Sequence, residues 1–278
     1  MTGTASRQPT EVGARNATFQ QWQALLRNRT KRHRAGEFLV QGVRPISQAV
    51  AEGWRIRALL HDGRPVPSAW ATRLWSNARA ARYVVSPELM AELGEKDDPP
   101  ELLAVVEMPA DDFGRIPAGE RMLTVVFDRP ASPGNVGTLI RSIDAFGGSG
   151  LVVTGHAADP YDPRCLRAST GSFFTVPVVR APSQREVIGW AGRLRSGGLP
   201  VAVLGTDEQG TADVRELDLR GPALLVIGNE TAGLAAAWRD ACDAVAAIPM
   251  TGTASSVNAA TAGSIVLYEA MRQRWAST

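Results

Sequence analysis

Consecutive aliphatic residues alternate with amphipathic segments over the second half of the chain. We expect strands at 122–127, 151–154, 176–179, 201–204, 224–227 and 245–248, and helices at 136–146, 163–169, 184–195, 234–241 and 257–274. A strand that is aliphatic at every position is buried on both faces, as in a parallel sheet covered by helices. The pattern therefore predicts an α/β domain with a mostly parallel sheet.

Shorter apolar segments precede this region and predict a separate, small α/β unit. Strands are expected at 37–40, 56–60, 83–85 and 102–106, and a helix at 45–52 that is followed by a glycine. Residues 108–120 contain two prolines and two glycines but few aliphatic side chains, which is typical of a linker. The chain is thus divided into a basic N-terminal arm (1–30, its first 14 residues a mobile tail), a small domain (31–107), a linker (108–120) and a larger domain (121–278).

Composition excludes several classes of protein. The 278 residues are 44% hydrophobic with a net charge of +2, which fits one or two globular domains and not a disordered chain. Two distant cysteines and three histidines argue against a disulfide framework and a zinc site, so no metal is expected. The N-terminus lacks the apolar core of a signal peptide, and no aliphatic run approaches the ~20 residues that span a bilayer. We expect a cytoplasmic protein without a membrane segment.

Three polar, glycine-bearing segments follow predicted strands, where ligands bind in open α/β sheets. In the first, residues 127–142, Asn135 lies at a helix start and Arg141 is placed to reach a phosphate or an active-site acceptor. The alternative is an ordinary N-cap followed by a solvated arginine. In the second, residues 224–234, Gly228 permits close backbone approach and Glu230 precedes a helix, which an ordinary capped helix start also explains.

The third segment, residues 248–263, is rich in small residues. A tight helix–sheet contact explains Ala259, Ala262 and Gly263 well, but it explains Ser256 and Asn258 less well. The sequence has no GxGxxG after the first strand of the α/β region, no GxxxxGK[ST] and no GxSxG. A Rossmann dinucleotide site, a P-loop and a hydrolase nucleophile elbow are therefore not supported.

Together, in this order and spacing, the three segments resemble the motifs of the SpoU/TrmH family of RNA ribose 2′-O-methyltransferases, within the SPOUT superfamily. The resemblance covers residues 122–275, and residues 31–107 are more weakly similar to the appended substrate-binding domain of that family. It implies a C-terminal trefoil-knotted methyltransferase domain and a small N-terminal α/β domain that resembles a ribosomal protein. It also implies S-adenosylmethionine as cofactor, a homodimer, and no metal.

The resemblance further implies roles for individual residues. Arg141 corresponds to the catalytic arginine, either as the base for the ribose hydroxyl or as a clamp on a substrate phosphate, with the clamp preferred because a charged guanidinium has no acceptor. Asn135 is expected to fix Arg141 or the ribose, Glu230 to anchor the loops, and Ser256 and Asn258 to shape the pocket. The cofactor-binding residues carried over by position are Leu204, Gly205, Thr206, Ile227, Gly228, Asn229, Ile248, Met250, Ser256 and Val257.

RNA recognition is expected from the most basic part of the chain. Residues 15–34 contain six basic side chains and no acidic one, and the aromatic residues Phe19 and Trp22 are candidates for stacking on bases. A solvated helix face is the alternative. The predicted RNA-binding residues are Arg27, Arg29, Lys31, Arg32, Arg34 and Arg44.

The leading hypothesis is methylation of 23S ribosomal RNA. The chain is similar to actinobacterial methyltransferases that confer resistance to ribosome-targeting antibiotics, and 28 of its 30 basic residues are arginine, which suits a GC-rich genome. Transfer RNA is the alternative substrate. The alternative of another class is a non-catalytic RNA-binding protein that acts in ribosome assembly.

Overall fold

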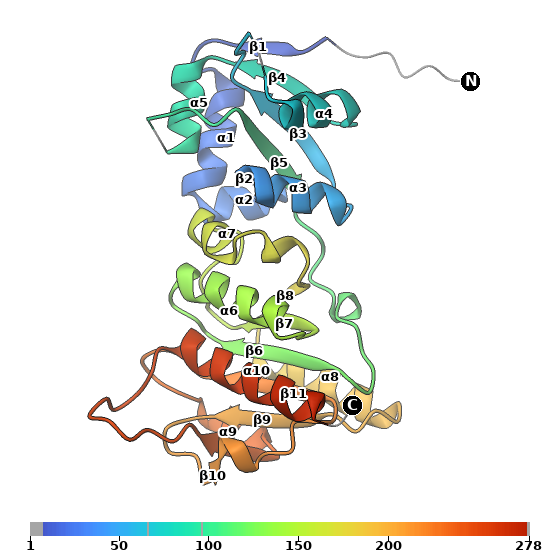
Figure 1. Ribbon diagram of the computed structural model, residues 1–278, viewed down its shortest axis with the longest axis vertical. Coiled ribbons are helices and arrows are strands. Elements are labelled where there is room, and N and C mark those ends of the chain that lie inside the picture. Colours follow the sequence, from blue (N-terminus) through green and yellow to red (C-terminus); the bar gives the residue numbers. More distant parts are fainter. Residues whose placement is uncertain (1–7, 66, 96, 277–278) are drawn as a thin grey trace. The chain divides into compact units, whose positions relative to one another are not determined.

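The computed structural model describes residues 8–65, 67–95 and 97–276 and divides the chain into two compact units, residues 1–109 and 110–278 (Figure 1). Residues 1–7, which belong to the predicted mobile tail, lie outside the described residues. No helix within the described ranges has both the length and the hydropathy that crossing a membrane requires.

The first unit contains a five-stranded sheet in the order β1-β4-β3-β5-β2. Strands β1, β4 and β3 are parallel to one another, whereas β5 is antiparallel to both β3 and β2. The elements are β1 (Thr10–Val12), α1 (Ala17–Arg27), α2 (Arg29–Ala35), β2 (Glu37–Gln41), α3 (Val43–Ala51), β3 (Ile56–His61), α4 (Ala69–Asn77), β4 (Ala81–Val85), α5 (Pro87–Gly94) and β5 (Leu102–Glu107).

The predicted arm over residues 1–30 is corrected by this arrangement, because its described part belongs to the first unit. Strand β1 pairs with β4, and the side chain of Asn16 caps α1 by accepting from the amide of Phe19. Helix α1 buries Phe19 and Trp22 in the core of the unit, and the Trp22 ring contacts Tyr83 edge-on at 4.9 Å. The two aromatic rings are therefore core residues, and the expectation that they stack on RNA bases is wrong.

The predicted linker over residues 108–120 is also corrected, since most of it packs within the second unit. Phe113, in a short 3-10 helix (Phe113–Arg115), stacks on Trp190 with ring centroids 4.8 Å apart. Ile116 is buried in the same hydrophobic core, and Arg115 donates from Nη1 to the carbonyl oxygen of Val178 at 2.8 Å. The boundary between the units thus falls at residues 109 and 110.

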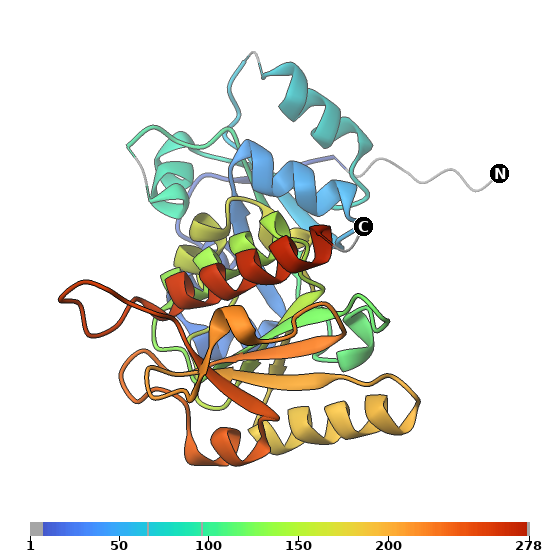
Figure 2. The ribbon, with the colours of Figure 1, turned by 60° about the horizontal axis from the view of Figure 1, so that its bottom comes forward.

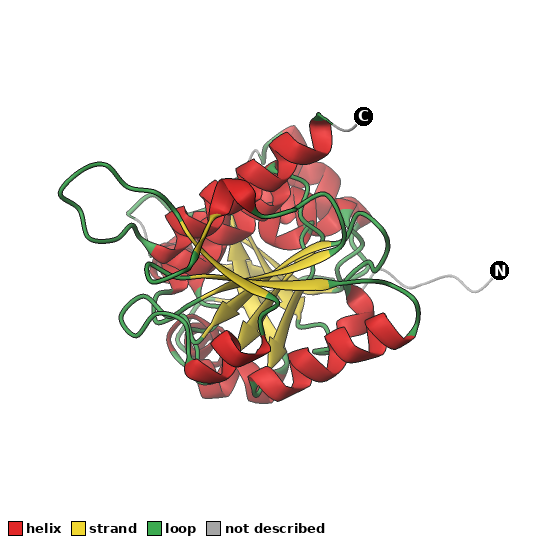
Figure 3. Ribbon diagram, turned by 90° about the horizontal axis from the view of Figure 1, so that it is seen from below, coloured by secondary structure: helices red, strands yellow, loops and turns green. Residues whose placement is uncertain are grey.

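The second unit contains a seven-stranded sheet in the order β10-β12-β9-β11-β6-β7-β8, and all of its strand pairs are parallel. Helices α6 and α10 cover one face, and α8 and α9 cover the other (Figures 2 and 3). The elements are β6 (Leu123–Asp128), α6 (Pro133–Ala145), β7 (Gly150–Thr154), α7 (Pro163–Ser169), β8 (Val178–Ala181), α8 (Gln184–Ser196), β9 (Ala202–Thr206), β10 (Ala212–Asp213), β11 (Ala223–Ile227), α9 (Ala236–Ala241), β12 (Ala244–Ala247) and α10 (Ala259–Trp275), with 3-10 turns at Ser172–Phe174 and Val214–Glu216.

Small residues bring α10 close to α6. A Cβ at Gly263 would lie 2.6 Å from Cδ1 of Leu139, and the hydroxyls of Ser142 and Ser264 are hydrogen-bonded at 2.7 Å. Gly263 therefore permits α10 to pack closely against both α6, at Leu139, and the sheet, at Ile227. This contact positions the start of α10 beside the start of α6. The passage of the chain through a knot stays a prediction.

Candidate active site

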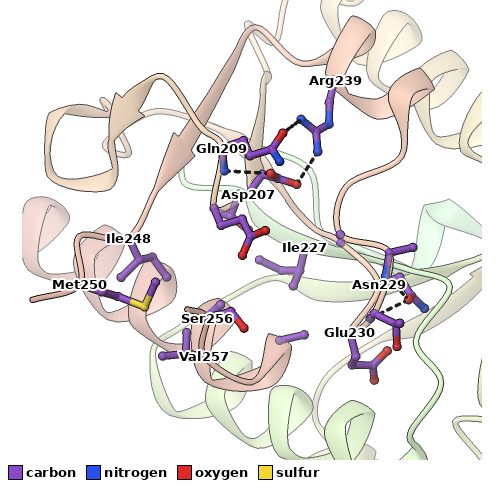
Figure 4. A pocket seen from close by; sticks show the side chains of 18 residues that line it. Asp207, Gln209, Ile227, Asn229, Glu230, Arg239, Ile248, Met250, Ser256 and Val257 are labelled. Carbon is purple, nitrogen blue, oxygen red and sulfur yellow. Dashed lines mark hydrogen bonds and ion pairs between the residues drawn. The ribbon is translucent and has the colours of Figure 1, made fainter. Parts of the chain in front are cut away.

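The loops that follow β9, β11 and β12 surround a pocket of about 400 Å³ in the second unit (Figure 4). Because these strands are parallel, their carboxyl ends lie at one edge of the sheet, where open α/β sheets bind ligands. Most of the predicted cofactor residues line this pocket: Thr206, Ile227, Gly228, Asn229, Ile248, Met250, Ser256 and Val257. The second and third segments singled out in the sequence are thus brought together at one end of the sheet.

Leu204 and Gly205 do not line the pocket, and their role as cofactor-binding residues stays a prediction. Both are buried in strand β9. A Cβ at Gly205 would lie 2.8 Å from Cδ2 of Leu234 and 3.0 Å from Sγ of Cys242, so glycine makes room for the segment before α9. These two residues support the pocket wall from behind.

A tight turn from Gly228 to Leu234 forms one wall of the pocket. Asn229 and Gly233 exchange two backbone hydrogen bonds of 3.0 Å, and Oδ1 of Asn229 accepts from the amides of Thr231 and Ala232 at 2.9 Å. A Cβ at Gly228 would lie 2.4 Å from the carbonyl carbon of Gly233. The turn therefore requires glycine at position 228.

A chain of hydrogen bonds joins all three segments. Asn258 accepts the amides of Ala260 and Thr261 at the start of α10, and its Nδ2 donates to Oδ1 of Asn135 at 3.1 Å. The Nδ2 of Asn135 donates to Oε1 of Glu230 at 3.0 Å. Asn135, Glu230 and Asn258 thus form one polar cluster.

Glu230 anchors the loop that leads into α6. Its two carboxylate oxygens accept the amides of Ala131 and Ser132 at 2.9 and 3.3 Å. Burial raises the pKa of Glu230, but the hydrogen bonds from Ala131, Asn135 and Ser132 together outweigh burial and hold that pKa below its usual value. The carboxylate is therefore charged near neutral pH and fixes the loop in place.

Arg141 and Ser256 lie outside this hydrogen-bonded cluster. Ser256 lines the pocket, whereas Arg141 projects from α6 with an exposed side chain. No hydrogen bond or ion pair joins the Arg141 side chain to another residue in the described part of the chain. Its guanidinium is thus free to meet a ligand that arrives from outside.

Asp207, Gln209 and Arg239 line the pocket although sequence reasoning did not select them. The Asp207 side chain is 4% exposed, and its Oδ2 accepts the amide of Leu234 and Nη2 of Arg239, both at 3.0 Å. Its Oδ1 accepts the amide of Gln209 at 3.0 Å (Figure 4). The only sequence signal for Asp207 is that an acidic residue directly follows a buried strand. Its partners Leu234 and Arg239 are distant in the sequence and reach it only in the folded protein.

Metal ligation is not indicated by the described side chains, since no three or more His, Cys, Asp or Glu residues among them are grouped to hold an ion. Both cysteines, Cys165 and Cys242, are free thiols. The polar groups at the site are amides, carboxylates, hydroxyls and guanidinium groups, which suit an organic ligand and a phosphate-bearing one.

Two family models match the chain. Residues 122–268 match the SpoU rRNA Methylase family, and residues 16–104 match the SpoU L30e-like domain. The second match begins at the cap of α1, which agrees with the place of that helix inside the first unit. The fold and the site define a methyltransferase, and the chain belongs to the SpoU rRNA Methylase family.

Relatives extend over nearly the whole chain. The 23S rRNA (uridine(2479)-2′-O)-methyltransferase of Streptomyces viridochromogenes is 58% identical over 95% of this chain and 92% of its own. The crystal structure of the SpoU methyltransferase AviRb from that organism, in complex with AdoMet, aligns with a TM-score of 0.90 over 94% of this chain and 99% of its own at 58% identity. The 23S rRNA (guanosine(2553)-2′-O)-methyltransferase RlmP of Bacillus subtilis strain 168 is 29% identical over 92% of this chain and 96% of its own.

These findings confirm the family, the α/β fold class and the methyltransferase class predicted from the sequence. A non-catalytic RNA-binding protein and a tRNA-specific enzyme are not favoured by them.

Proposed function

We propose that this protein transfers a methyl group from S-adenosylmethionine to a ribose 2′-hydroxyl of 23S ribosomal RNA, on a uridine. The observation that carries the proposal is the junction of the pocket with the Asn135–Glu230–Asn258 cluster, which joins a cofactor-sized cavity to groups that suit a ribose and a phosphate. The uridine rests on the 58% identity to the Streptomyces enzyme.

The residues present fit this cofactor. A volume of about 400 Å³ lies in the usual range of ligand pockets. Met250 and Val257 line the pocket and are 40% and 38% exposed. Together with Ile227 and Ile248, they offer apolar side chains against which the planar adenine base can pack. Glu208, Asn229 and Ser256 supply polar groups for the remainder of the molecule. When bound, S-adenosylmethionine supplies an electrophilic sulfonium methyl group.

Around that methyl group, the protein has to hold the ribose hydroxyl in line with the methyl carbon, while the hydroxyl proton passes to solvent water. Asn135, which is fixed by Glu230 and Asn258, is placed to orient the ribose. Arg141 is exposed and unpaired among the described residues, and a guanidinium remains protonated in proteins. We therefore assign Arg141 to clamp the phosphate beside the target ribose, so that the hydroxyl oxygen meets the methyl carbon.

Transfer of labelled methyl groups tests the proposal. The purified protein and radiolabelled S-adenosylmethionine are incubated in three separate reactions, with unmethylated 23S rRNA, with 16S rRNA and with bulk tRNA. Label in 23S rRNA alone is expected. Label in tRNA alone would show that tRNA, and not 23S rRNA, is the substrate. No label in any RNA would contradict the proposal. Resistance of cells that carry the gene to a ribosome-targeting antibiotic stays a prediction of the resemblance.

RNA binding is proposed for the exposed members of the predicted set, which are Arg27, Arg29, Lys31, Arg34 and Arg44. Arg32 is removed from the set because its side chain is buried. Arg32 is 2% exposed, and its Nη1 donates to the carbonyl oxygens of Leu25 and Leu26 at 2.8 and 3.0 Å. It therefore satisfies the last carbonyls of α1 and stabilises the corner between α1 and α2.

Reversing two of these charges should weaken RNA binding and its salt dependence. For Arg29→Glu combined with Lys31→Glu, we expect the slope of log affinity against log salt to become shallower by roughly two phosphate contacts. Filter binding of a 23S rRNA fragment at several salt concentrations measures it, with Arg73→Glu on α4 as the control variant. Equal slopes for both variants would exclude α2 from the RNA-binding surface.

A homodimer is proposed through the outer face of α10. Ile265, Tyr268 and Trp275 follow one stripe of this helix and are 36%, 52% and 74% exposed. Apolar side chains aligned in this way on a surface indicate a protein contact. Because Asn258 caps the start of α10, the Ile265 end of this contact lies near the proposed reaction centre.

Ile265→Arg is expected to convert the dimer to a monomer in analytical ultracentrifugation, because it places a charge in the apolar stripe. Ile188→Arg is the matched control, since Ile188 on α8 is 37% exposed and lies outside the stripe. A dimer that survives Ile265→Arg as it survives Ile188→Arg would show that α10 is not the interface.

A further inference from the structure

Arg129 has an unusual backbone conformation at the edge of the site. It is one of three non-glycine residues with positive φ in the described part of the chain, together with Glu95 and Thr170. The other two end the helices α5 and α7, where a left-handed residue is an ordinary helix terminus. Arg129, with φ of 47°, instead joins strand β6 to the loop before α6. A glycine would adopt this conformation without strain, so an arginine at position 129 lowers the stability of the folded protein relative to glycine.

The surroundings hold this arginine in one orientation. Asp128 is 4% exposed, and its Oδ2 pairs with Nε and Nη2 of Arg129, both at 2.9 Å. The other carboxylate oxygen of Asp128 accepts the hydroxyl of Thr154 at 2.8 Å. A Cβ at Gly155 would lie 2.8 Å from Cγ of Arg129, so glycine at 155 leaves room for the stem of the arginine.

The backbone of Arg129 is tied to the pocket wall. Its carbonyl oxygen accepts from Nδ2 of Asn229 at 2.6 Å, and its amide donates to the carbonyl of Thr154 at 3.0 Å. The amides of the nearby Ala131 and Ser132 are held by Glu230. Arg129 therefore belongs to the same fixed loop as Asn135, on the β7 side of the polar cluster.

We propose that Arg129 binds a phosphate of the RNA substrate, as a second cation in addition to Arg141. The Arg129 side chain is 40% exposed, and its Nη1 has no partner among the residues that the structure describes. A guanidinium oriented by a buried carboxylate and open on its outer edge is suited to donate two hydrogen bonds to a phosphate. The inference rests on the proposed function, because it takes an RNA as the ligand of this edge.

Two substitutions separate the charge of Arg129 from its strain. Arg129→Gly removes the charge and the strain together, whereas Arg129→Met removes the charge and keeps a Cβ and an unbranched side chain at the same φ. If the guanidinium binds RNA, both variants should weaken binding of an in vitro transcribed 23S rRNA fragment by about tenfold. The salt slope should fall by about one phosphate contact in both.

Binding of S-adenosylmethionine is expected to stay at the wild-type value in both variants, and the melting temperature of Arg129→Gly should be equal to or above that of Arg129→Met. In methyl transfer, the KM for RNA should rise while kcat is largely kept. Arg220→Ala is the control, because Arg220 is an exposed arginine paired with Asp218 on another loop.

Wild-type RNA affinity and salt slope in either folded variant would overturn the inference and leave Arg129 as the partner of Asp128 alone. Weaker RNA binding that is matched by weaker S-adenosylmethionine binding would also overturn it, since the loss would then come from the loop. A wild-type protein that binds the fragment but methylates no RNA would refute the proposed function instead, and the binding series would still decide the role of Arg129.

Discussion

Replacing Arg141 by alanine is expected to lower methyl transfer by about a thousandfold while S-adenosylmethionine binding keeps its wild-type affinity. Arg141 projects from α6 outside the pocket, so its loss removes no group that lines the cofactor cavity. Single-turnover transfer to 23S rRNA measures the rate, and calorimetry measures cofactor binding. Thr138→Ala is the matched control, because Thr138 is also exposed on α6 and should be dispensable.

Arg141→Lys distinguishes a phosphate clamp from a general base. A clamp keeps its charge as lysine but loses the two-pronged geometry, so partial activity without a pH dependence of its own is expected between pH 7 and 9. A base at this position would instead give a rate that rises with pH until the lysine is deprotonated. Wild-type activity in Arg141→Ala would remove the residue from the reaction altogether.

Replacing Gly228 by valine is expected to weaken S-adenosylmethionine binding by about a hundredfold or more. A Cβ at this position would lie 2.4 Å from the carbonyl carbon of Gly233 and 2.5 Å from the amide nitrogen of Leu234. Both are backbone atoms of the turn that walls the pocket, so they cannot move aside without deforming it. Isothermal titration calorimetry measures the affinity.

Gly192→Ala provides the control for this substitution. Gly192 lies in α8, and a Cβ there would have no atom within 4 Å, so alanine should be neutral or slightly stabilising. Cofactor affinity in Gly228→Val equal to that of Gly192→Ala would contradict the place of this turn in the cofactor site.

The sequence predicted the parts of the site that depend on local chemistry. Gly228 and Glu230 follow the buried strand β11 in a turn that requires glycine at 228, and Asn135 follows β6 as the third residue of α6, whose N-cap is Ser132. Their mutual contacts follow because parallel strands end at one edge of the sheet. Six of the seven strands of the second unit were predicted from their mainly aliphatic sequences, whereas the two-residue strand β10 was not.

The features that the sequence did not predict, namely the burial of α1 and Arg32 and the position of Asp207, depend on tertiary packing. The apolar face of α1 consists of Phe19, Trp22, Leu25 and Leu26, but it is interspersed with glutamines and is followed by the basic residues of α2, which suggested an exposed basic arm. Arg32 is one of those basic residues, and only the corner between α1 and α2 buries it. Asp207 gains its place through Leu234 and Arg239, which are 27 and 32 residues away along the chain.

The position of the methyl group in the product tests the central claim most directly. After reaction with the wild-type protein, 23S rRNA is digested to nucleosides and analysed by mass spectrometry, with Arg141→Ala as the parallel sample. One added 2′-O-methyluridine per molecule with the wild-type protein, and none with Arg141→Ala, is the predicted result. A methyl group on a base, or equal methylation by both proteins, would contradict a ribose hydroxyl held by this site.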